Sequence, residues 1–111
     1  QKPIFRSTER VNLKEPIIMQ CEDINNTKIL VKNISDKGLG VEVLGENKFK
    51  INQKINVKID KEVVTGTVVR KDKKLYGIMF EDVSKQAMLE IMRIYIDNLE
   101  PYYKLKRDQI H

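Results

Sequence analysis

Apolar and polar residues alternate along most of the chain up to residue 80, which is the pattern of β-strands with one buried face. Short polar or glycine-containing segments separate the alternating runs. Pro16 interrupts the first run, so we expect that strand to be bent or bulged there. The predicted strands are residues 11–21, 27–34, 38–44, 55–59, 63–69 and 75–80. Six strands with short turns favour a small antiparallel barrel or sandwich over a fold with parallel strands and crossover helices.

The pattern becomes helical in the last third of the chain. Over residues 83–99 the apolar residues recur at helical spacing and form a wide stripe. Asp82 and Ser84 are candidate N-caps, since a short side-chain oxygen can accept a hydrogen bond from the first free amides of a helix. Pro101 disfavours extension beyond Glu100 without a break. We therefore predict one amphipathic C-terminal helix of about four turns that packs on the barrel.

The chain divides into three parts by sequence. Residues 1–10 form a polar N-terminal tether, residues 11–100 hold the barrel and its helix, and residues 101–111 are a basic tail whose order the sequence leaves open. A chain of 111 residues is long enough for one domain with a modest core. It begins with Gln1 rather than methionine, from which we expect a processed product or a domain of a longer protein.

The composition limits the partners and the kinds of site that the chain can have. The formal net charge is +5 and charged residues make up 33% of the chain, which favours anionic partners. Cys21 is the only cysteine, so no internal disulfide can form, and we expect its side chain to be buried or half-buried. His111 is the only histidine, so one chain cannot assemble a Ser-His or Cys-His catalytic pair or a histidine-containing zinc site. No apolar run reaches the roughly 20 residues of a transmembrane helix. We therefore predict that the chain is not an enzyme, binds no cofactor or metal, and does not insert into a membrane.

Two arginines mark the segment just before the first strand. Arg6 and Arg10 stand four residues apart in the sequence FRSTER. Each guanidinium offers a planar fork of donors that can pair at two points with phosphate oxygens or with the O6/N7 edge of guanine. The alternative is two solvated surface arginines.

A second motif lies in the turn between the second and third predicted strands. Asn33 carries both an acceptor and a donor for a base edge, Ser35 adds a hydroxyl, and Gly38 permits a tight turn or a close approach of a ligand. The alternative is a polar β-turn with these residues in turn positions. Both motifs are complete and occur in one chain in this order.

At these residues the chain resembles the PilZ domain family, bacterial receptors for the second messenger cyclic di-GMP. The family's RxxxR motif reads here as residues 6–10, and its [Asp/Asn]-x-Ser-x-x-Gly motif as residues 33–38. The run GLGVEV and the later GTVVRKDKKLYGIMFED are also similar to the family. The resemblance extends from Phe5 to Leu99. It implies a mainly β fold, a six-stranded antiparallel barrel with a C-terminal helix packed on it, in agreement with the strand count.

The resemblance also implies which residues bind the ligand. Arg6 and Arg10 would contact guanine edges and phosphates, while the opposing surface on the barrel is formed by Asn33, Ser35 and Gly38. Cyclic di-GMP would then sit between the tether and the barrel.

Two further positions are candidates by the same resemblance. Arg70 stands where some relatives place another ligand-contacting side chain, although a solvated hairpin arginine is equally compatible with the sequence. Phe5 departs from the arginine that many relatives carry just before the first motif. In the family this position is associated with binding one molecule or a stacked pair, so the number of ligands stays open.

The function implied is that of a non-catalytic regulatory domain that binds cyclic di-GMP, orders its tether and signals to a parent protein. Relatives occur in flagellar-brake proteins and in membrane glycosyltransferases such as cellulose synthase catalytic subunits, which control motility or exopolysaccharide production. The implied location is the cytoplasm, in some relatives at the inner face of the membrane through the parent protein. The main alternative is a small basic β-barrel that binds single-stranded nucleic acid, although aromatic residues are only 6% of the chain.

Overall fold

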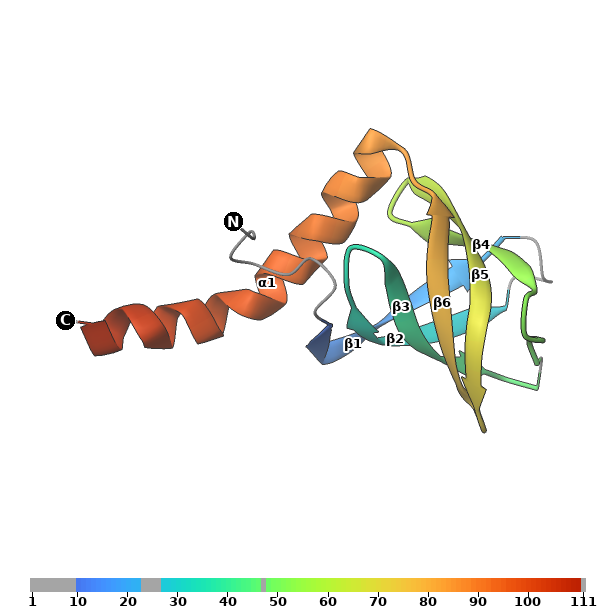
Figure 1. The fold of residues 1–111 in the computed structure, drawn as a ribbon, viewed down its shortest axis with the longest axis horizontal. Coiled ribbons are helices and arrows are strands. Elements are labelled where there is room, and N and C mark those ends of the chain that lie inside the picture. The colour runs from blue at the N-terminus through green and yellow to red at the C-terminus, as the bar shows by residue number, and fades with distance from the viewer. Residues whose placement is uncertain (1–9, 23–26, 47, 111) are drawn as a thin grey trace, which may run out of the picture.

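The computed structural model describes residues 10–22, 27–46 and 48–110, with side chains described through Asn98. Six antiparallel strands form a closed barrel and a long helix follows them (Figure 1). The strand order is β1-β2-β3-β6-β5-β4, and β4 pairs with β1 to close the barrel. The strands are β1 Val11–Cys21, β2 Lys28–Ile34, β3 Gly38–Leu44, β4 Lys54–Ile59, β5 Glu62–Asp72 and β6 Leu75–Asp82. The predicted fold class is confirmed.

The alternating apolar residues fill the interior of the barrel. The apolar residues that alternate with polar ones along β2, β3 and β4 are all buried, namely Ile29, Val31, Ile34, Leu39, Val41, Val43, Ile55, Val57 and Ile59. Cys21 is buried as well, as predicted. Burying one such Ile or Val side chain contributes roughly 1.5–3 kcal/mol, so this core is the main source of stability.

An aromatic pair fixes the long connection between β3 and β4. Phe49 lies in this connection and is fully buried, and its ring centroid is 5.2 Å from that of Tyr76 on β6. The amide of Phe49 donates a hydrogen bond to the Tyr76 hydroxyl oxygen at 3.3 Å. A tilted aromatic contact adds to the burial of both rings.

The bulge expected in β1 is present and is covered by the helix. Asn12 pairs with Asn33 of β2, whereas Ile17 already pairs with Val31, so the register shifts between them, around Pro16. Proline has no amide hydrogen to donate to a neighbouring strand. The extra residues of the bulge also leave backbone groups outside the hydrogen-bond pattern of the sheet. The Lys14 amide instead donates to Oδ1 of Asn98 on the helix at 3.0 Å.

The helix α1, Lys85–Ile110, begins where the sequence indicated. Oγ of Ser84 accepts a hydrogen bond from the Ala87 amide at 3.1 Å, so Ser84 is the N-cap. The other candidate, Asp82, is the last residue of β6. Ala87 and Ile91 are fully buried against the barrel.

The end of α1 differs from the sequence prediction. Pro101 was expected to prevent extension beyond Glu100 without a break, but the helix continues through this position to Ile110. A proline inside a helix removes one hydrogen bond, here the bond to the carbonyl of Asp97, and it bends the helix without necessarily ending it. Figure 1 shows that the helix axis changes direction as it leaves the barrel.

Two searches of the described residues are negative. Within 10–22, 27–46 and 48–110, no helix is both long and apolar enough to cross a membrane. In the same ranges no group of three His, Cys, Asp or Glu side chains is placed to hold a metal ion.

Candidate functional site

The two sequence motifs meet in space. Arg10 directly precedes β1, and Asn33 lies near the end of β2. Nη1 of Arg10 donates a hydrogen bond to Oδ1 of Asn33 at 2.8 Å, across 23 positions of sequence. Since Asn12 is the register partner of Asn33, the start of β1 necessarily brings Arg10 to this part of β2. The barrel therefore joins a residue of RxxxR to the first residue of the second motif.

Asn33 belongs to a row of residues that runs across four neighbouring strands. In the register, Asn33 of β2 pairs with Gly40 of β3, Gly40 pairs with Gly77 of β6, and Gly77 pairs with Arg70 of β5. The register shifts between Val31 and Asn33 and again between Val68 and Arg70. Such irregularities change the direction in which a side chain points, and they are common beside functional sites.

The two glycines form the floor on which the polar side chains lie. A Cβ added to Gly40 would lie 2.5 Å from both Nδ2 and Oδ1 of Asn33, and a Cβ added to Gly77 would lie 3.2–3.3 Å from Arg70 atoms. The side chains of Asn33 and Arg70 thus lie over bare backbone in the middle of the row. A side chain at position 40 would displace the Asn33 amide, and one at position 77 would press on the Arg70 side chain. We call these four residues the Asn33–Arg70 row.

A shallow groove of about 250 Å³ follows the Asn33–Arg70 row on the outside of the barrel. Its lining includes the whole row together with Lys32, Asp72, Leu75 and Tyr76. The polar groups of the lining are the Asn33 amide, the Arg70 guanidinium, the Lys32 ammonium and the Asp72 carboxylate. The two glycines let a flat group approach the backbone closely.

Positive charge concentrates at this groove. Partial burial, together with the neighbouring Arg70 guanidinium, lowers the pKa of Arg10 below its ordinary value. Arg10 nevertheless stays charged at neutral pH, because an arginine pKa lies far above 7. Two guanidiniums that repel one another beside a groove are stabilised by an anion placed between them. The groove is therefore suited to a planar, anionic ligand.

The remaining residues of the second motif shape the turn between β2 and β3. Ser35 is 2% exposed, and its Oγ accepts a hydrogen bond from the Lys37 amide at 3.1 Å. Gly38 packs against β6, where an added Cβ would lie only 2.1 Å from the carbonyl oxygen of Ile78. The Phe80 amide on β6 donates to the carbonyl of Lys37 at 2.8 Å. Ser35 and Gly38 thus hold the turn that follows Asn33, and their contact with a ligand stays a prediction.

The other predicted site residues divide into two groups. Arg70, for which the sequence left two interpretations, lines the groove with Asn33. Phe5 and Arg6 lie outside the described residues. The sequence reasoning missed Gly40 and Gly77 as part of the site. The available signal was a glycine inside each of two strand-like runs, GLGVEV and LYGIMF, which indicates close approach of another group to the backbone.

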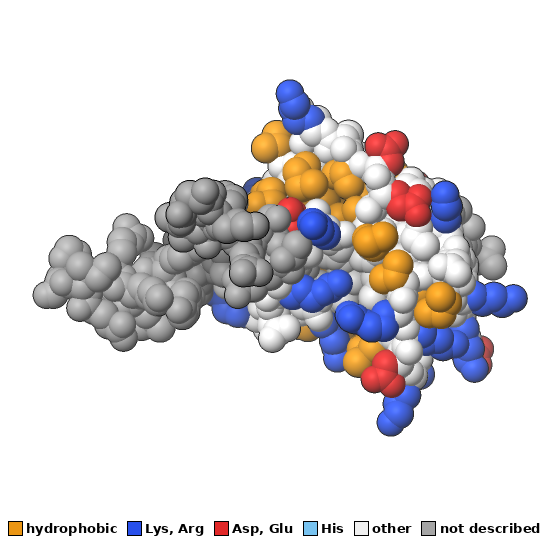
Figure 2. Space-filling model, in the orientation of Figure 1, with side chains coloured by type: hydrophobic (Ala, Val, Ile, Leu, Met, Phe, Trp, Pro, Cys, Tyr) orange, Lys and Arg blue, Asp and Glu red, His pale blue; other side chains and the backbone are white. Residues whose placement is uncertain are grey.

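A larger groove lies next to the site and has a different character. It measures about 610 Å³ and is lined by Lys48, Lys71, Lys73 and Lys74 around Tyr76, which lines both grooves. None of the motif residues that the structure describes lines it. Figure 2 shows lysine and arginine side chains gathered on the corresponding end of the barrel, away from the helix. These lysines extend the positive surface beyond Arg70.

Comparisons with known proteins were made on the sequence and on the fold. A family model described as the PilZ domain matches residues 5–97. The structure of YcgR in complex with c-di-GMP from Escherichia coli is similar at a TM-score of 0.66 and 16% identity; the match covers 96% of this chain and 50% of that one. The structure of the PilZ domain of YcgR with c-di-GMP, also from Escherichia coli, gives a TM-score of 0.65 at 15% identity, covering 93% and 97%. A search of curated protein sequences gives no significant match.

Proposed function

Since this chain belongs to the PilZ domain family, we propose that it is a non-catalytic regulatory domain that binds cyclic di-GMP in the groove along the Asn33–Arg70 row. The two similar solved structures, both described as complexes with c-di-GMP, support this ligand. The observation that carries the proposal is the hydrogen bond between Arg10 and Asn33, which unites the two motifs beside the groove.

The chemistry of the groove supports a role for each polar group. Arg10 and Arg70 supply two guanidinium forks, which suit the phosphates and the O6/N7 edge of guanine in the ligand. Oδ1 of Asn33 accepts from Arg10, so its amide nitrogen is left to donate to a base or a phosphate. Arg6 would add a third fork from the tether, opposite the barrel. The ligand neutralises the repulsion between Arg10 and Arg70, which favours binding.

Nucleic-acid binding receives less support. Barrels that bind single strands use exposed aromatic rings on which bases stack. Among the side chains that the structure describes, Phe49 and Tyr76 are buried and Phe80 and Tyr95 are half-buried. The described surface therefore has positive charge without an exposed stacking ring.

Calorimetric titration tests the proposed ligand. We expect cyclic di-GMP to bind with measurable heat, while GMP, GTP and a single-stranded oligonucleotide bind much more weakly, because only the cyclic dinucleotide presents two guanines and two phosphates to the arginines. Tight binding of the oligonucleotide together with no heat from cyclic di-GMP would replace this proposal with the nucleic-acid function.

The binding event offers a route for signalling. Arg6 and Arg10 belong to the segment before β1, and Arg10 already contacts the barrel through Asn33. We propose that the ligand fixes the rest of this segment against the barrel and so changes the surface that a neighbouring domain meets. The chain spans half the length of the YcgR chain it resembles. A longer parent protein, either a flagellar-brake-like protein or a membrane glycosyltransferase, would then receive the signal in the cytoplasm or at the inner face of the membrane.

Hydrogen exchange tests this route. Amides of residues 6–10 should exchange several-fold more slowly when cyclic di-GMP is saturating, since the arginines then bridge the ligand and the barrel. Amides in the paired core of β4 provide the internal control, and their protection should not change. Equal protection of residues 6–10 with and without ligand would mean that the site is preformed, and the signalling route would then be wrong even if the ligand bound.

A further inference from the structure

Helix α1 carries a second apolar stripe besides the one that packs on the barrel. The barrel-facing residues are Ala87 and Ile91, both fully buried, with Met88, Ile94 and Tyr95 packed against the core. Leu89 and Ile96 point elsewhere, because their side chains are 59% and 54% exposed. Figure 2 shows hydrophobic side chains gathered over the first part of the helix, beside charged ones. A single exposed apolar side chain is ordinary, but several in a continuous stripe indicate a surface available to another molecule.

The spacing of this second stripe is that of a helix pairing seam. From Leu89 the apolar residues recur in the sequence at alternating intervals of three and four over the length of α1. Its members are Leu89, Met92, Ile96, Leu99, Tyr103 and Ile110, with Lys106 at the remaining position. A mean interval of 3.5 residues keeps a stripe aligned with a second helix, whereas packing on a barrel does not require that period. The stripe is roughly 32 Å long, at 1.5 Å per residue.

Pro101 does not interrupt the stripe. In the seven-residue repeat that begins at Leu89, position 101 falls on the side of the helix opposite the stripe. The proline therefore leaves the stripe positions of the repeat unbroken in the sequence.

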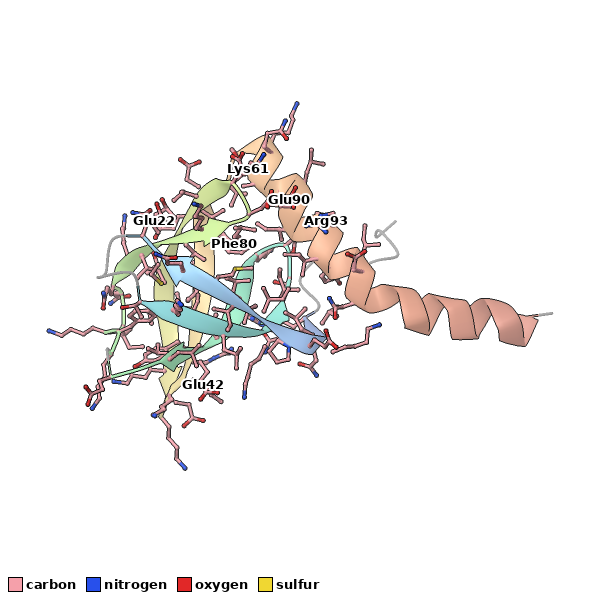
Figure 3. The ribbon with its side chains drawn as sticks, turned by 180° about the vertical axis from the view of Figure 1, so that it is seen from behind. Glu22, Glu42, Lys61, Phe80, Glu90 and Arg93 are labelled. Atoms are coloured by element: carbon pink, nitrogen blue, oxygen red, sulfur yellow. The ribbon has the colours of Figure 1, made fainter. Side chains whose placement is uncertain are left out.

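The charges beside the stripe favour a partner that runs in the opposite direction. Residues 89–100 carry three acidic side chains and one basic one, whereas residues 101–110 carry three basic side chains and one acidic one. In the first half, Arg93 lies beside Glu90 on α1, at 2.9 Å (Figure 3). Arg93 also lies 3.8 Å from Asp97, so one basic side chain faces two acidic ones and the acidic excess remains. Two parallel copies would place like charges together, and two antiparallel copies place each basic half against an acidic half.

We propose that the stripe of α1 pairs with the same stripe of a second copy of this chain, in antiparallel orientation, to form a dimer. The residues of this contact are distinct from those of the Asn33–Arg70 row, so the dimer and the ligand site can be tested separately. Neither the stripe nor its charges depend on cyclic di-GMP.

Light scattering after size-exclusion chromatography tests the dimer. At high protein concentration the mass should be twice the 13.0 kDa of one chain. Ile96→Glu places a charge in the seam without removing a buried side chain, so it should give a folded monomer. Ile51→Glu is the matched control, since Ile51 is 48% exposed in the β3–β4 connection, and it should remain dimeric. A wild-type mass of one chain at every concentration, or a dimer of Ile96→Glu, would overturn the proposal.

Spin labels test the orientation in the dimer. Gln86 is exposed near the start of α1, and Cys21 is buried, so a single label can be placed through Gln86→Cys. In an antiparallel pair the two labels should lie roughly 35–45 Å apart, because the helix starts are at opposite ends of the seam. In a parallel pair they would lie within about 20 Å, since paired helix axes are 8–10 Å apart. A short distance between the labels would contradict the antiparallel arrangement.

Discussion

Replacement of Arg10 by alanine is expected to lower the affinity for cyclic di-GMP by about five- to 150-fold, equivalent to about 1–3 kcal/mol for a lost two-point contact. The reason is geometric, because Arg10 is the residue that the barrel holds against Asn33 at the rim of the groove. Arg10→Lys should recover little of the loss, since an ammonium keeps the charge but lacks the planar fork. Titration calorimetry of the two variants against the wild type measures both effects.

The stability of the Arg10→Ala variant separates binding from folding. The bond to Asn33 joins exposed groups, so its removal should change the melting temperature without ligand only slightly. Arg93→Ala is the matched control, because Arg93 is an exposed arginine with carboxylate partners on α1, away from the groove. That variant should bind cyclic di-GMP as the wild type does. Near-wild-type binding by Arg10→Ala would instead mean that Arg10 is a solvated surface residue with no role in binding.

Gly38→Ala is expected to destabilise the fold by about 3 kcal/mol or more, a larger effect than that of a typical surface substitution. The added Cβ would lie 2.1 Å from the carbonyl oxygen of Ile78, a backbone atom that can move only if β6 moves. This displacement would also weaken the hydrogen bond from the Phe80 amide to the Lys37 carbonyl. Thermal melts without ligand measure the loss, at about 4 °C per kcal/mol for a domain of this size.

Gly45→Ala is the control that distinguishes a steric clash at Gly38 from a general sensitivity of the fold to replacement of its glycines. Gly45 has a φ of 100°, and an added Cβ there would meet no atom within 4 Å. Only backbone strain opposes the substitution, at a cost of about 1–2 kcal/mol. If Gly38→Ala melted at the wild-type temperature, the close approach to β6 would not be needed for folding, and Gly38 would have to be explained by the ligand instead.

The residues of the second motif have different positions in the structure. Asn33 lies in the groove and contacts Arg10, whereas Ser35 and Gly38 are buried in the turn that follows. Sequence reasoning grouped all three as ligand-binding residues, with a plain β-turn as the alternative. The structure shows the turn, whereas ligand binding by these residues stays a prediction; a turn that is fixed against β6 also fixes the position of Asn33.

The sequence by itself determined the number of strands, the buried apolar positions and the irregular region at Pro16, and it narrowed the helix cap to Asp82 or Ser84, since each follows from a local period or a neighbouring backbone group. The motifs likewise indicated the family before any fold was known. Only the tertiary structure decided which residues meet across strands. Register depends on bulges near Asn33 and Arg70 and on how the barrel closes, so no local pattern reveals that Gly40 and Gly77 lie between them. The continuation of α1 through Pro101 was also missed, because local rules give the cost of a proline but not whether the rest of a helix tolerates it.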